Sequence, residues 1–369
     1  MWAVVSDLGW RKTIVYASVA LVMVGSVVFA IGEVATRILL PQDLSGSWQV
    51  YSERGYYSSK AGGGSRHQYR DRVVHYRFND LHLRGGQVGP GARVLVLGDS
   101  FTFGWLVNEE DSYVGILAAN ADRELGKDRY EFLNGASGGW GTSDYLAFLE
   151  DLGPVIRPDI LLVFLGFDDI QRSLNSRLYT VDDDGELVAH DVASSRLKVL
   201  VNALPGYQFL LEHSHLVQLV RNVGVRSIIS TPGVRAEGLK KTEGPLDPRA
   251  FPLARALFRR IKAWCGEHGV RLLVATYGFH RWYGESLSQA DRAFYDQTEE
   301  FFAKEGIPFG DVVDEVSAAA PSYEGFITAD GVHPNEAGHR LIAEAVWRWL
   351  EPELLQSAPV GVGSSRPTR

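Results

Sequence analysis

Short apolar runs alternate with longer amphipathic stretches between residues 92 and 352. Short apolar runs bounded by glycine or polar residues are typical of buried strands, and apolar positions three and four apart are typical of helices. Strands are predicted at Val94–Leu97, Tyr130–Leu133, Ile160–Leu165, Val270–Thr276 and Ile307–Phe309. Helices are predicted at Tyr113–Leu125, Thr142–Leu149, Pro252–Glu267, Ser288–Glu305 and Glu336–Leu350. The alternation predicts a three-layer α/β/α domain at 92–352, with a five-stranded parallel sheet whose strands end at one shared edge.

A separate apolar stretch lies near the N-terminus, where Ile14–Ile31 contains 18 residues without a charge. At ~1.5 Å per residue, a helix of this length spans ~27 Å, enough for the apolar core of a bilayer. Two basic residues precede the stretch and Glu33 follows it. The positive-inside rule then predicts a cytoplasmic segment at 1–12, a single-pass anchor in the cytoplasmic membrane at 13–35, and a periplasmic or extracytoplasmic main domain.

Two alternatives compete with this anchor. A cleaved signal peptide usually has a shorter apolar region of about 7–15 residues. A buried core helix is the other alternative, but the stretch that follows is rich in glycine and has little hydrophobic pattern. We therefore expect an uncleaved anchor.

The remaining segments lack the regular alternation. We expect a linker and packing segment at 36–91, a helical insertion at 171–248 and a disordered tail at 353–369. Within the insertion, Asp182–Gly185 is expected to be a turn or hairpin tip rather than a calcium loop, because the full spacing of ligands is missing. One or two amphipathic helices are expected at 195–229, packed on the core; covering the active site, contacting the membrane and binding a partner are alternatives.

Composition narrows the class of protein. The chain has 369 residues and a net charge of −8, which argues against nucleic-acid binding. A single cysteine, Cys265, excludes an internal disulfide and a cysteine-based metal site. The ten histidines show no metal-binding spacing. We therefore expect neither a metal nor another cofactor.

The predicted strand Val94–Leu97 ends at Gly98-Asp99-Ser100. A small polar residue at the end of a buried parallel strand lies at the carboxyl edge of the sheet, near helical N–H groups that favour developing negative charge. Ser100 is therefore a candidate nucleophile. A strand–turn–helix junction in which Asp99 or Ser100 caps the helix explains the same residues equally well, so the rest of the chain has to decide.

Asp330 and His333 lie three residues apart in a loop that precedes the last predicted helix. In such a turn the carboxylate can reach the imidazole, fix its tautomer and stabilise the imidazolium, as a base that activates serine requires. The alternative interpretation makes Asn335 a helix cap and His333 an ordinary loop residue. The pair gains weight because Ser100 ends the first core strand of the same domain.

Two further stretches follow predicted strands. The glycines of Asn134–Thr142 permit a close backbone approach, so that an N–H group there could face an oxyanion; a simple turn into the next helix is the alternative. Gly166–Asp169 ends the third strand, and helix capping is the default role of its two aspartates.

Together, GDSFTFG, NGASGGWGT, GFDD and DGVHPN, in this order, resemble the motif blocks of the SGNH/GDSL esterase superfamily. The similarity is greatest to membrane-anchored bacterial members, in which the N-terminal helix ends in a Glu…Arg pattern, here Glu33 and Arg37. Asn79–Arg84 and Glu212–Leu216 also look family-like. The resemblance covers residues 14–350 and implies a flavodoxin-like SGNH hydrolase fold.

The resemblance also implies roles for individual residues. Ser100 would be the nucleophile, His333 the general base and Asp330 its orienting acid. The N–H groups of Ser100 and Gly139 would be two oxyanion donors. The family's third donor is the asparagine of Gly-x-Asn-Asp, where this chain has Asp168. An ionised carboxylate only accepts hydrogen bonds, so this oxyanion hole is atypical.

We therefore expect a serine esterase or acyltransferase that acts on acyl esters, above all acetyl esters, of cell-envelope or exported glycans. Trp105, Trp140, Trp282 and Tyr283 are candidates for stacking on sugar rings, although core packing is the commoner role of such aromatic residues. One alternative is a catalytically impaired glycan-binding or assembly protein that keeps the fold; another is a lipid esterase or lysophospholipase. The expected partners are the ester substrate and the membrane, and protein partners are left open.

Overall fold

The computed structural model describes residues 2–192, 200–202, 204–229, 247–277, 289–320 and 325–356. The chain forms two compact units. The first contains residues 1–47 and 204–234, and the second contains residues 48–203 and 235–369.

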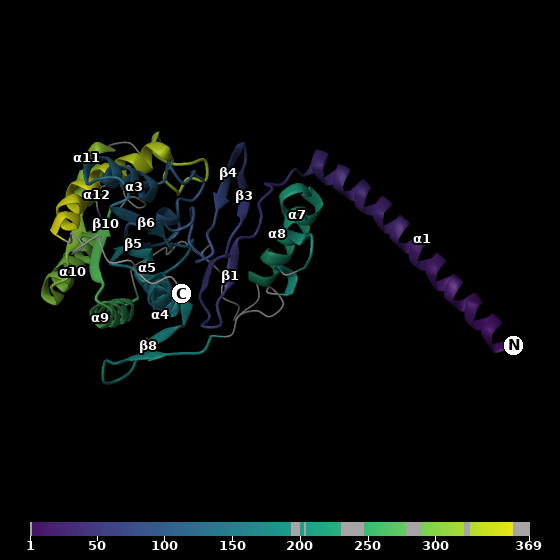
Figure 1. The fold of residues 1–369 in the computed structure, drawn as a ribbon, viewed down its shortest axis with the longest axis horizontal. Helices are drawn as coiled ribbons and strands as arrows, with labels where there is room; N and C mark the ends of the chain where they lie inside the picture. Colours follow the sequence, from purple (N-terminus) through teal and green to yellow (C-terminus); the bar gives the residue numbers. More distant parts are fainter. Residues whose placement is uncertain are drawn as a thin grey trace. The chain divides into compact units, whose positions relative to one another are not determined.

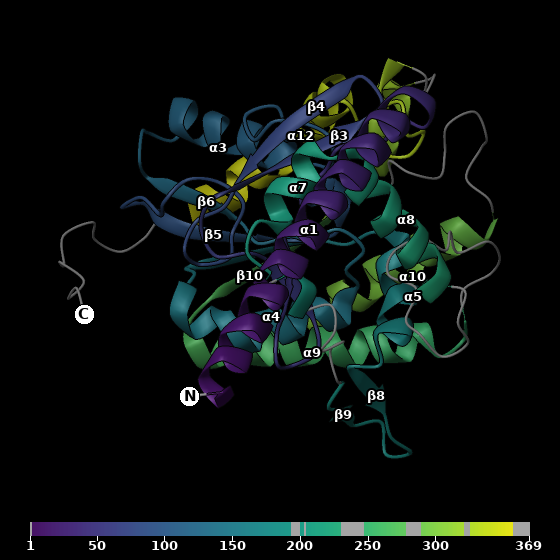
Figure 2. The same ribbon diagram turned by 90° about the vertical axis from the view of Figure 1, so that its right-hand side faces the viewer.

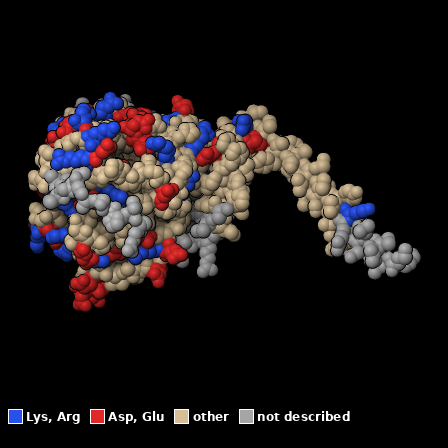
Figure 3. Space-filling model, viewed as in Figure 1, with Lys and Arg blue, Asp and Glu red and all other residues tan. Residues whose placement is uncertain are grey.

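The first unit consists of α1 (Trp2–Leu39), α7 (Tyr207–His213) and α8 (His215–Ile229). Within α1, Lys12–Leu39 is long and apolar enough to cross a membrane, with a mean hydropathy of 2.5 and no part of its most apolar window buried. The middle of the helix carries no charged side chain (Figure 3). These properties fit the predicted anchor, and a signal sequence has them too.

The second unit is built on a five-stranded parallel sheet (Figure 1). Its strands are β5 (Ala92–Leu97), β6 (Tyr130–Asn134), β7 (Ile160–Phe164), β10 (Arg271–Thr276) and β11 (Phe309–Asp311). They lie in the order β11-β10-β7-β5-β6, and every neighbouring pair is parallel. This confirms the predicted flavodoxin-like fold. Strand β5, which lies between β7 and β6, carries the candidate nucleophile at its carboxyl end.

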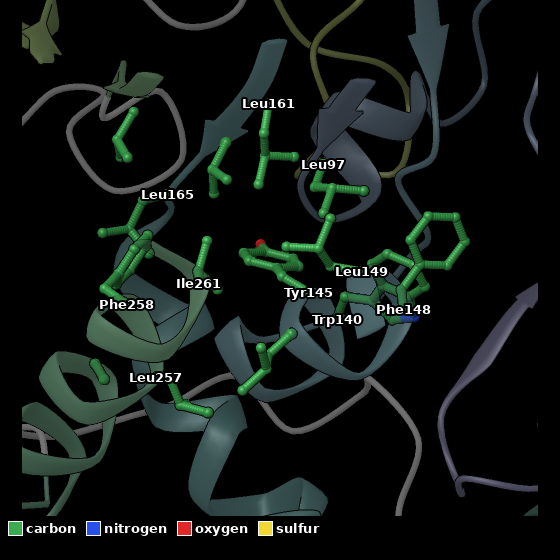
Figure 4. Close-up of a cluster of buried hydrophobic side chains, with 14 of the residues drawn as sticks. Leu97, Trp140, Tyr145, Phe148, Leu149, Leu161, Leu165, Leu257, Phe258 and Ile261 are labelled. Atoms are coloured by element: carbon green, nitrogen blue, oxygen red, sulfur yellow. The ribbon is translucent and has the colours of Figure 1, made fainter. Parts of the chain in front are cut away.

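Helices cover both faces of this sheet, because successive residues of a buried strand point to opposite sides. Val94 and Val96 of β5 pack with α3 (Tyr113–Glu124) and α12 (Glu336–Gln356), beside α11 (Val313–Ala319). Leu95 and Leu97 pack in the opposite core (Figure 4). The helices of that core are α4 (Thr142–Ile156), α5 (Phe167–Ser176), α9 (Ala250–His268) and α10 (Gln289–Glu305).

The segment at 36–91, expected to be a linker that packs on the domain, is divided between the two units. Residues 36–39 continue α1, and from Trp48 onward the chain belongs to the second unit. It forms two antiparallel hairpins: β1 (Gln49–Tyr51) pairs with β2 (Tyr57–Ser59), and β3 (Gly64–Tyr69) pairs with β4 (Arg72–Arg77). Buried aromatic residues such as Tyr56 and Tyr76, both 1% exposed, hold these hairpins on the domain.

The expected insertion begins later than predicted, because α5 extends to Ser176. β8 (Tyr179–Val181) and β9 (Leu187–Ala189) then form a projecting hairpin with Asp182–Gly185 at its tip, as expected (Figure 2). Parts of the expected helices at 195–229, namely 195–199 and 203, lie outside the described residues. At the C-terminal end, α12 runs to Gln356, so residues 353–356 are helical, and the rest of the expected tail also lies outside the described residues.

Candidate active site

The nucleophile candidate lies at the start of α2 (Ser100–Phe103), directly after β5. Asp99 caps this short helix, since its Oδ1 accepts the N–H of Phe101 at 2.9 Å. Gly98 is required by close packing, because a Cβ at this position would meet the hydroxyl of Thr102. The capping role of Asp99 and a nucleophilic role of Ser100 are therefore compatible, and the two interpretations of this stretch do not exclude each other.

A continuous line of hydrogen bonds joins Ser100 to the loop before α12. The Oγ of Ser100 lies 2.8 Å from Nε2 of His333. Nδ1 of the same ring lies 2.6 Å from Oδ2 of Asp330. The fold thus brings Ser100 to a pair of residues more than 200 positions away, in the arrangement expected of a nucleophile, a base and its orienting acid. Asn335 caps α12 through hydrogen bonds from the N–H groups of Ala337 and Gly338.

The carboxylate of Asp330 is held in its ionised form. Its Oδ1 accepts hydrogen bonds from the hydroxyl of Thr328 and from the backbone N–H groups of Val332 and His333. Burial alone would raise the pKa of Asp330, but the hydrogen bond and charge of His333, together with Thr328, hold this pKa well below its usual range. Asp330 is therefore fixed in position and negative at neutral pH.

Aromatic rings line one side of His333. The ring of Trp105 stacks on it at a centroid distance of 5.6 Å and an angle of 27°. Trp105 is half-buried and in turn contacts Trp48 and His67, with His67 edge-on at 4.5 Å. Trp48 and His67 come from the segment expected to be a linker, and the sequence analysis did not identify them. Trp105 keeps a partly exposed surface beside the base, as its predicted substrate contact requires.

The structure does not support stacking on a sugar ring by Trp140. This side chain is fully buried, and its indole N–H donates to the carbonyl of Tyr57 at 2.6 Å. It packs among Tyr145, Phe148 and their neighbours in the core (Figure 4). A tryptophan without exposed surface cannot stack on a sugar, so the expected contact is corrected to core packing. The other two candidates, Trp282 and Tyr283, lie outside the described residues.

The glycine-rich turn after β6 lies beside the nucleophile. A Cβ placed on Gly138 would come 3.6 Å from the Cβ of Ser100 and 3.1 Å from the ring of Trp105. Gly139 has a φ of 78°, a left-handed conformation that favours glycine. The carbonyl of Gly138 accepts the hydroxyl of Tyr57 at 2.6 Å, which fixes the turn. The turn that contains Gly138 and Gly139 therefore lies beside Ser100, and the oxyanion role of the Gly139 N–H stays a prediction.

A buried arginine supports the loop after α2. Arg84 is 4% exposed, and its guanidinium donates to the carbonyls of Phe103, Gly104 and Val107. The same group lies over the rings of Tyr76 and Phe103. Burial lowers the pKa of Arg84 from its usual value. Arg84 was noted only as part of a family-like segment, and nothing in its sequence neighbours reveals these distant contacts.

On the opposite side of Ser100, one arginine faces three aspartates. Nη1 of Arg172 lies 2.8 Å from Oδ2 of Asp99 and 3.0 Å from Oδ1 of Asp169. Nη2 of Arg172 lies 3.7 Å from Oδ2 of Asp168, the atypical residue of the predicted oxyanion hole. The cluster links the nucleophile turn to the first turns of α5. Sequence analysis missed Arg172, although its spacing of four residues from Asp168 on a predicted strand-to-helix turn was a visible signal.

The charged groups of this cluster shift one another's pKa values. Burial and the nearby charge of Asp99 raise the pKa of Asp169 well above its usual range, against the opposing effect of Arg172. Asp169 also accepts hydrogen bonds from the hydroxyl of Tyr145 at 2.7 Å and the N–H of Gly166 at 2.6 Å. Burial would lower the pKa of Arg172, but the three carboxylates raise it above its usual value. Arg172 therefore stays positive.

Within the described residues, no three His, Cys, Asp or Glu side chains are grouped as ligands for a metal ion.

Comparisons with solved structures find similar chains of low identity. TesA is 16% identical, with a TM-score of 0.42 over 70% of this chain and 98% of TesA. The acetylxylan esterase Axe2 from Geobacillus stearothermophilus is 15% identical, with a TM-score of 0.42 over 72% of this chain and 96% of Axe2. The psychrotrophic esterase EstA from Pseudoalteromonas sp. is 12% identical, with a TM-score of 0.40 over 72% and 99%. Structural similarities this weak give no information about the substrate of this chain.

Sequence comparison is more decisive about the family. No curated protein matches the chain. Residues 96–341, well over half of the chain, match the model of the GDSL-like lipase/acylhydrolase family. The match begins within β5, before Ser100, and ends after His333. Cleavage of acyl esters is the general chemistry of this family. The chain therefore belongs to the GDSL-like lipase/acylhydrolase family, within the SGNH/GDSL superfamily.

Proposed function

We propose that this protein is a serine-dependent acyl-ester hydrolase or acyltransferase in which Ser100, His333 and Asp330 form the catalytic triad. The observation that carries the proposal is the unbroken hydrogen-bond line from Asp330 through His333 to Ser100, with distances of 2.6 and 2.8 Å. Family membership gives the reaction class, and the geometry supports the proposed assignment of roles.

The proposed reaction follows from these positions. Ser100 Oγ attacks the carbonyl carbon of the ester while its proton passes to Nε2 of His333. The imidazolium is stabilised by Asp330 and then returns the proton to the departing alcohol oxygen as the C–O bond breaks, leaving an acyl-serine. Water, or the hydroxyl of an acceptor, then attacks the acyl-serine with His333 as base, and the acyl group leaves Ser100.

The oxyanion formed in each step would face the N–H groups of Ser100 and Gly139. Asp168 takes the place of the family's third donor, and a carboxylate cannot donate when it is ionised. Its pairing with Arg172 offsets part of the negative charge that would otherwise oppose the oxyanion. Loss of one donor from such a hole typically raises the barrier by about 2.7–4 kcal/mol. We therefore propose a slow enzyme rather than an inactive one.

Acyl groups on cell-envelope or exported glycans are the proposed substrates, with acetyl the proposed acyl group. Two observations support this choice: the predicted position of the domain outside the cytoplasm, and the partly exposed ring of Trp105 beside His333, which suits stacking on a sugar ring. Hydrolysis and transfer share the first half-reaction and differ only in the acceptor.

Asp168 favours one other function, a glycan-binding protein that has the fold but no turnover. The test uses the full chain in detergent micelles, incubated with p-nitrophenyl acetate and with a fluorophosphonate that labels activated serines. We expect labelling and acetate release in the parent and neither in Ser100→Ala. Equal rates in the two proteins, with no labelling, would reject the enzyme and leave the binding protein. Acetyl transfer is distinguished from hydrolysis by adding an oligosaccharide: a transferase acetylates it, whereas a hydrolase releases acetate.

A further inference from the structure

The C-terminal part of α1 is joined to α7 and α8 by a set of specific hydrogen bonds. The carboxylate of Glu33 accepts the hydroxyl of Ser214 at 2.7 Å and the N–H groups of His215 and Leu216 at 3.0 Å each. It therefore caps the first turn of α8, whose N–H groups have no partner inside the helix. Arg37 bonds both Glu33 and the carbonyl of His213 at 3.3 Å.

The chain after α1 continues this attachment. The N–H of Gln42 donates to Nδ1 of His215 at 2.9 Å, and the amide of Asn222 donates to the side chain of Gln42 at 3.1 Å. The N–H of Ser47 donates to Gln208 at 2.9 Å. Packing is equally close, because a Cβ on Gly32 would meet Leu216 at 2.9 Å. The end of α1 thus forms a folded unit with α7 and α8 (Figures 1 and 2).

The position of this attachment along α1 is informative. Glu33 and Gly32 directly follow the charge-free stretch that ends at Ile31. A bilayer has an apolar core of ~30 Å and a headgroup layer of roughly 5–8 Å on each side. The eight residues from Gly32 to Leu39 rise ~12 Å at ~1.5 Å per residue, which is enough to cross that layer. With α1 in a membrane, α7 and α8 are therefore attached at the level of the headgroups.

At the level of the headgroups, several apolar side chains of α7 and α8 are exposed. On α8, Leu216, Val220 and Val223 form one stripe at the helical spacing. Leu216 packs on Gly32 of α1, whereas Val220 is 64% exposed and Val223 is 55% exposed. Phe209 of α7 is 63% exposed. The stripe therefore begins on α1, whose own side chains, such as Ile31 at 64%, are uncovered as well.

We propose that α7 and α8 form a membrane-surface platform, whose exposed apolar stripe inserts into the lipid headgroup region beside the anchor. The occupant is the lipid bilayer itself, because the stripe is continuous with the apolar surface of α1 and begins where the charge-free stretch ends. Helices of this kind lie in the interface with their apolar face about 5–10 Å deep. The polar side of α8, through Gln218, Arg221 and Asn222, is occupied by the segment after α1.

Site-specific fluorescence tests the platform. Single cysteines replace Val220 and Val223 in the full chain, carry an environment-sensitive nitrobenzoxadiazole probe and are placed in phosphatidylcholine nanodiscs. Asp183→Cys, exposed at the tip of the β8–β9 hairpin, is the water-exposed control. The native Cys265 is buried, and burial raises its pKa to about 12, so it reacts poorly with the label at neutral pH.

The stripe labels are expected to emit at shorter wavelength than the control. Spin-labelled lipids should quench them more strongly when the spin label lies near the headgroup than when it lies near the chain end. Emission equal to that of Asp183→Cys, without quenching, would overturn the proposal. Shielding that appears only in native membranes and not in nanodiscs would also overturn it, in favour of a protein partner.

A second variant keeps the test decisive if the cysteine variants fold poorly. Glu33→Gln removes the charge that caps α8 while leaving the apolar stripe intact. We expect faster proteolysis within α7 and α8 in nanodiscs than in the parent, and unchanged cleavage would contradict the attachment. None of these readouts depends on Ser100, so failure of the platform and failure of the proposed activity can be distinguished.

Discussion

The two sides of Ser100 are built from different kinds of interaction. On the acid–base side, His333 and Asp330 come from one short loop and face each other at 2.6 Å. On the oxyanion side, Arg172 on α5 balances three carboxylates that come from two separate turns of the sheet edge. The first side has the family's pattern, and the second departs from it at Asp168.

This difference separates two requirements of serine catalysis. Generating a nucleophile needs one proton path, which the acid–base side provides. Holding the charge that the attack creates needs donors, and here a carboxylate stands where a donor is usual. Arg172 makes that substitution tolerable, because it offsets the added charge without itself being the expected donor. The comparison predicts that changes on the two sides will alter activity in opposite directions.

The largest effect is expected from Asp330→Asn. The amide retains the size of the carboxylate, but it can place an N–H group towards Nδ1 of His333 and so favour the wrong tautomer. The loss of kcat is expected to approach ~10⁴-fold, as in related triads. The measurement is steady-state hydrolysis of p-nitrophenyl acetate. A loss smaller than ~10-fold would show that Asp330 does not control the protonation of His333.

Arg172→Met should destabilise the oxyanion side. It leaves Asp99 and the buried Asp169 without their counter-charge, and breaking a buried ion pair typically costs about 3–5 kcal/mol of unfolding free energy. Because the side chain of Arg172 is 23% exposed, we expect the lower end, about 3 kcal/mol. Urea unfolding measures the change.

The matched control for this variant is Arg348→Met. Arg348 pairs with Glu315 at 2.7 Å, but both side chains are at least half exposed, so about 1 kcal/mol or less is expected. Equal losses in the two variants would show that the cluster at Arg172 is no more than a surface ion pair.

Asp168→Asn is expected to raise activity. The amide restores the family's donor and removes a negative charge from the hole, which corresponds to about 2.7–4 kcal/mol or roughly 10²–10³-fold in kcat. Asp168→Ala separates the two contributions, since it removes the charge without adding a donor. A gain in the alanine variant equal to that in the asparagine variant would assign the whole effect to charge. No gain in either would show that Asp168 does not face the oxyanion.

The sequence predicted the acid–base side well, for a physical reason. Ser100 ends a strand, and Asp330 reaches His333 within one turn, so local spacing and the parallel sheet are sufficient to bring the three together. The five parallel strands followed from the alternation of apolar runs and amphipathic stretches, whereas their order was implied by the family resemblance. Helix ends were less accurate: α4 continues seven residues beyond the predicted Leu149, through Gly153 and Pro154.

The rest of the site depends on contacts that local patterns do not encode. Trp48 and His67 reach Trp105 from hairpins in which Gly, Ser and Arg interrupt the apolar pattern. The position of Arg84 depends on its hydrogen bonds to three carbonyl groups that are distant in the sequence. The burial of Trp140 depends on the hydrogen bond to Tyr57, which lies 83 residues away. Each of these contacts depends on how the whole chain packs. A sequence motif can therefore indicate which stretch belongs to the site, but not which distant residues contact that stretch.

The smallest expected effect concerns pH. Two histidines buried in the described part of the chain flank the acid–base side: His67 contacts Trp105, and His339 on α12 accepts the N–H of Tyr113 at 3.2 Å. Burial, with a contribution from the charge of His333, lowers the pKa of each to about 3. The unfolded chain therefore binds more protons than the folded chain between about pH 6.5 and 3, and stability falls as pH decreases through this window.

The slope expected from each histidine is about 1.4 kcal/mol per pH unit well below pH 6.5. His339→Gln keeps an acceptor for Tyr113 but cannot titrate, so it should remove one histidine's share of the slope. Urea unfolding of the parent and the variant between pH 7 and pH 5 measures it. Parallel curves would mean that His339 is protonated in the folded state, and the pH sensitivity would then belong to another group. A reduced slope of unfolding free energy against pH in His339→Gln would assign part of the acid sensitivity to the acid–base side of Ser100. Arg172 would then keep its charge and its ion pairs over the same pH range.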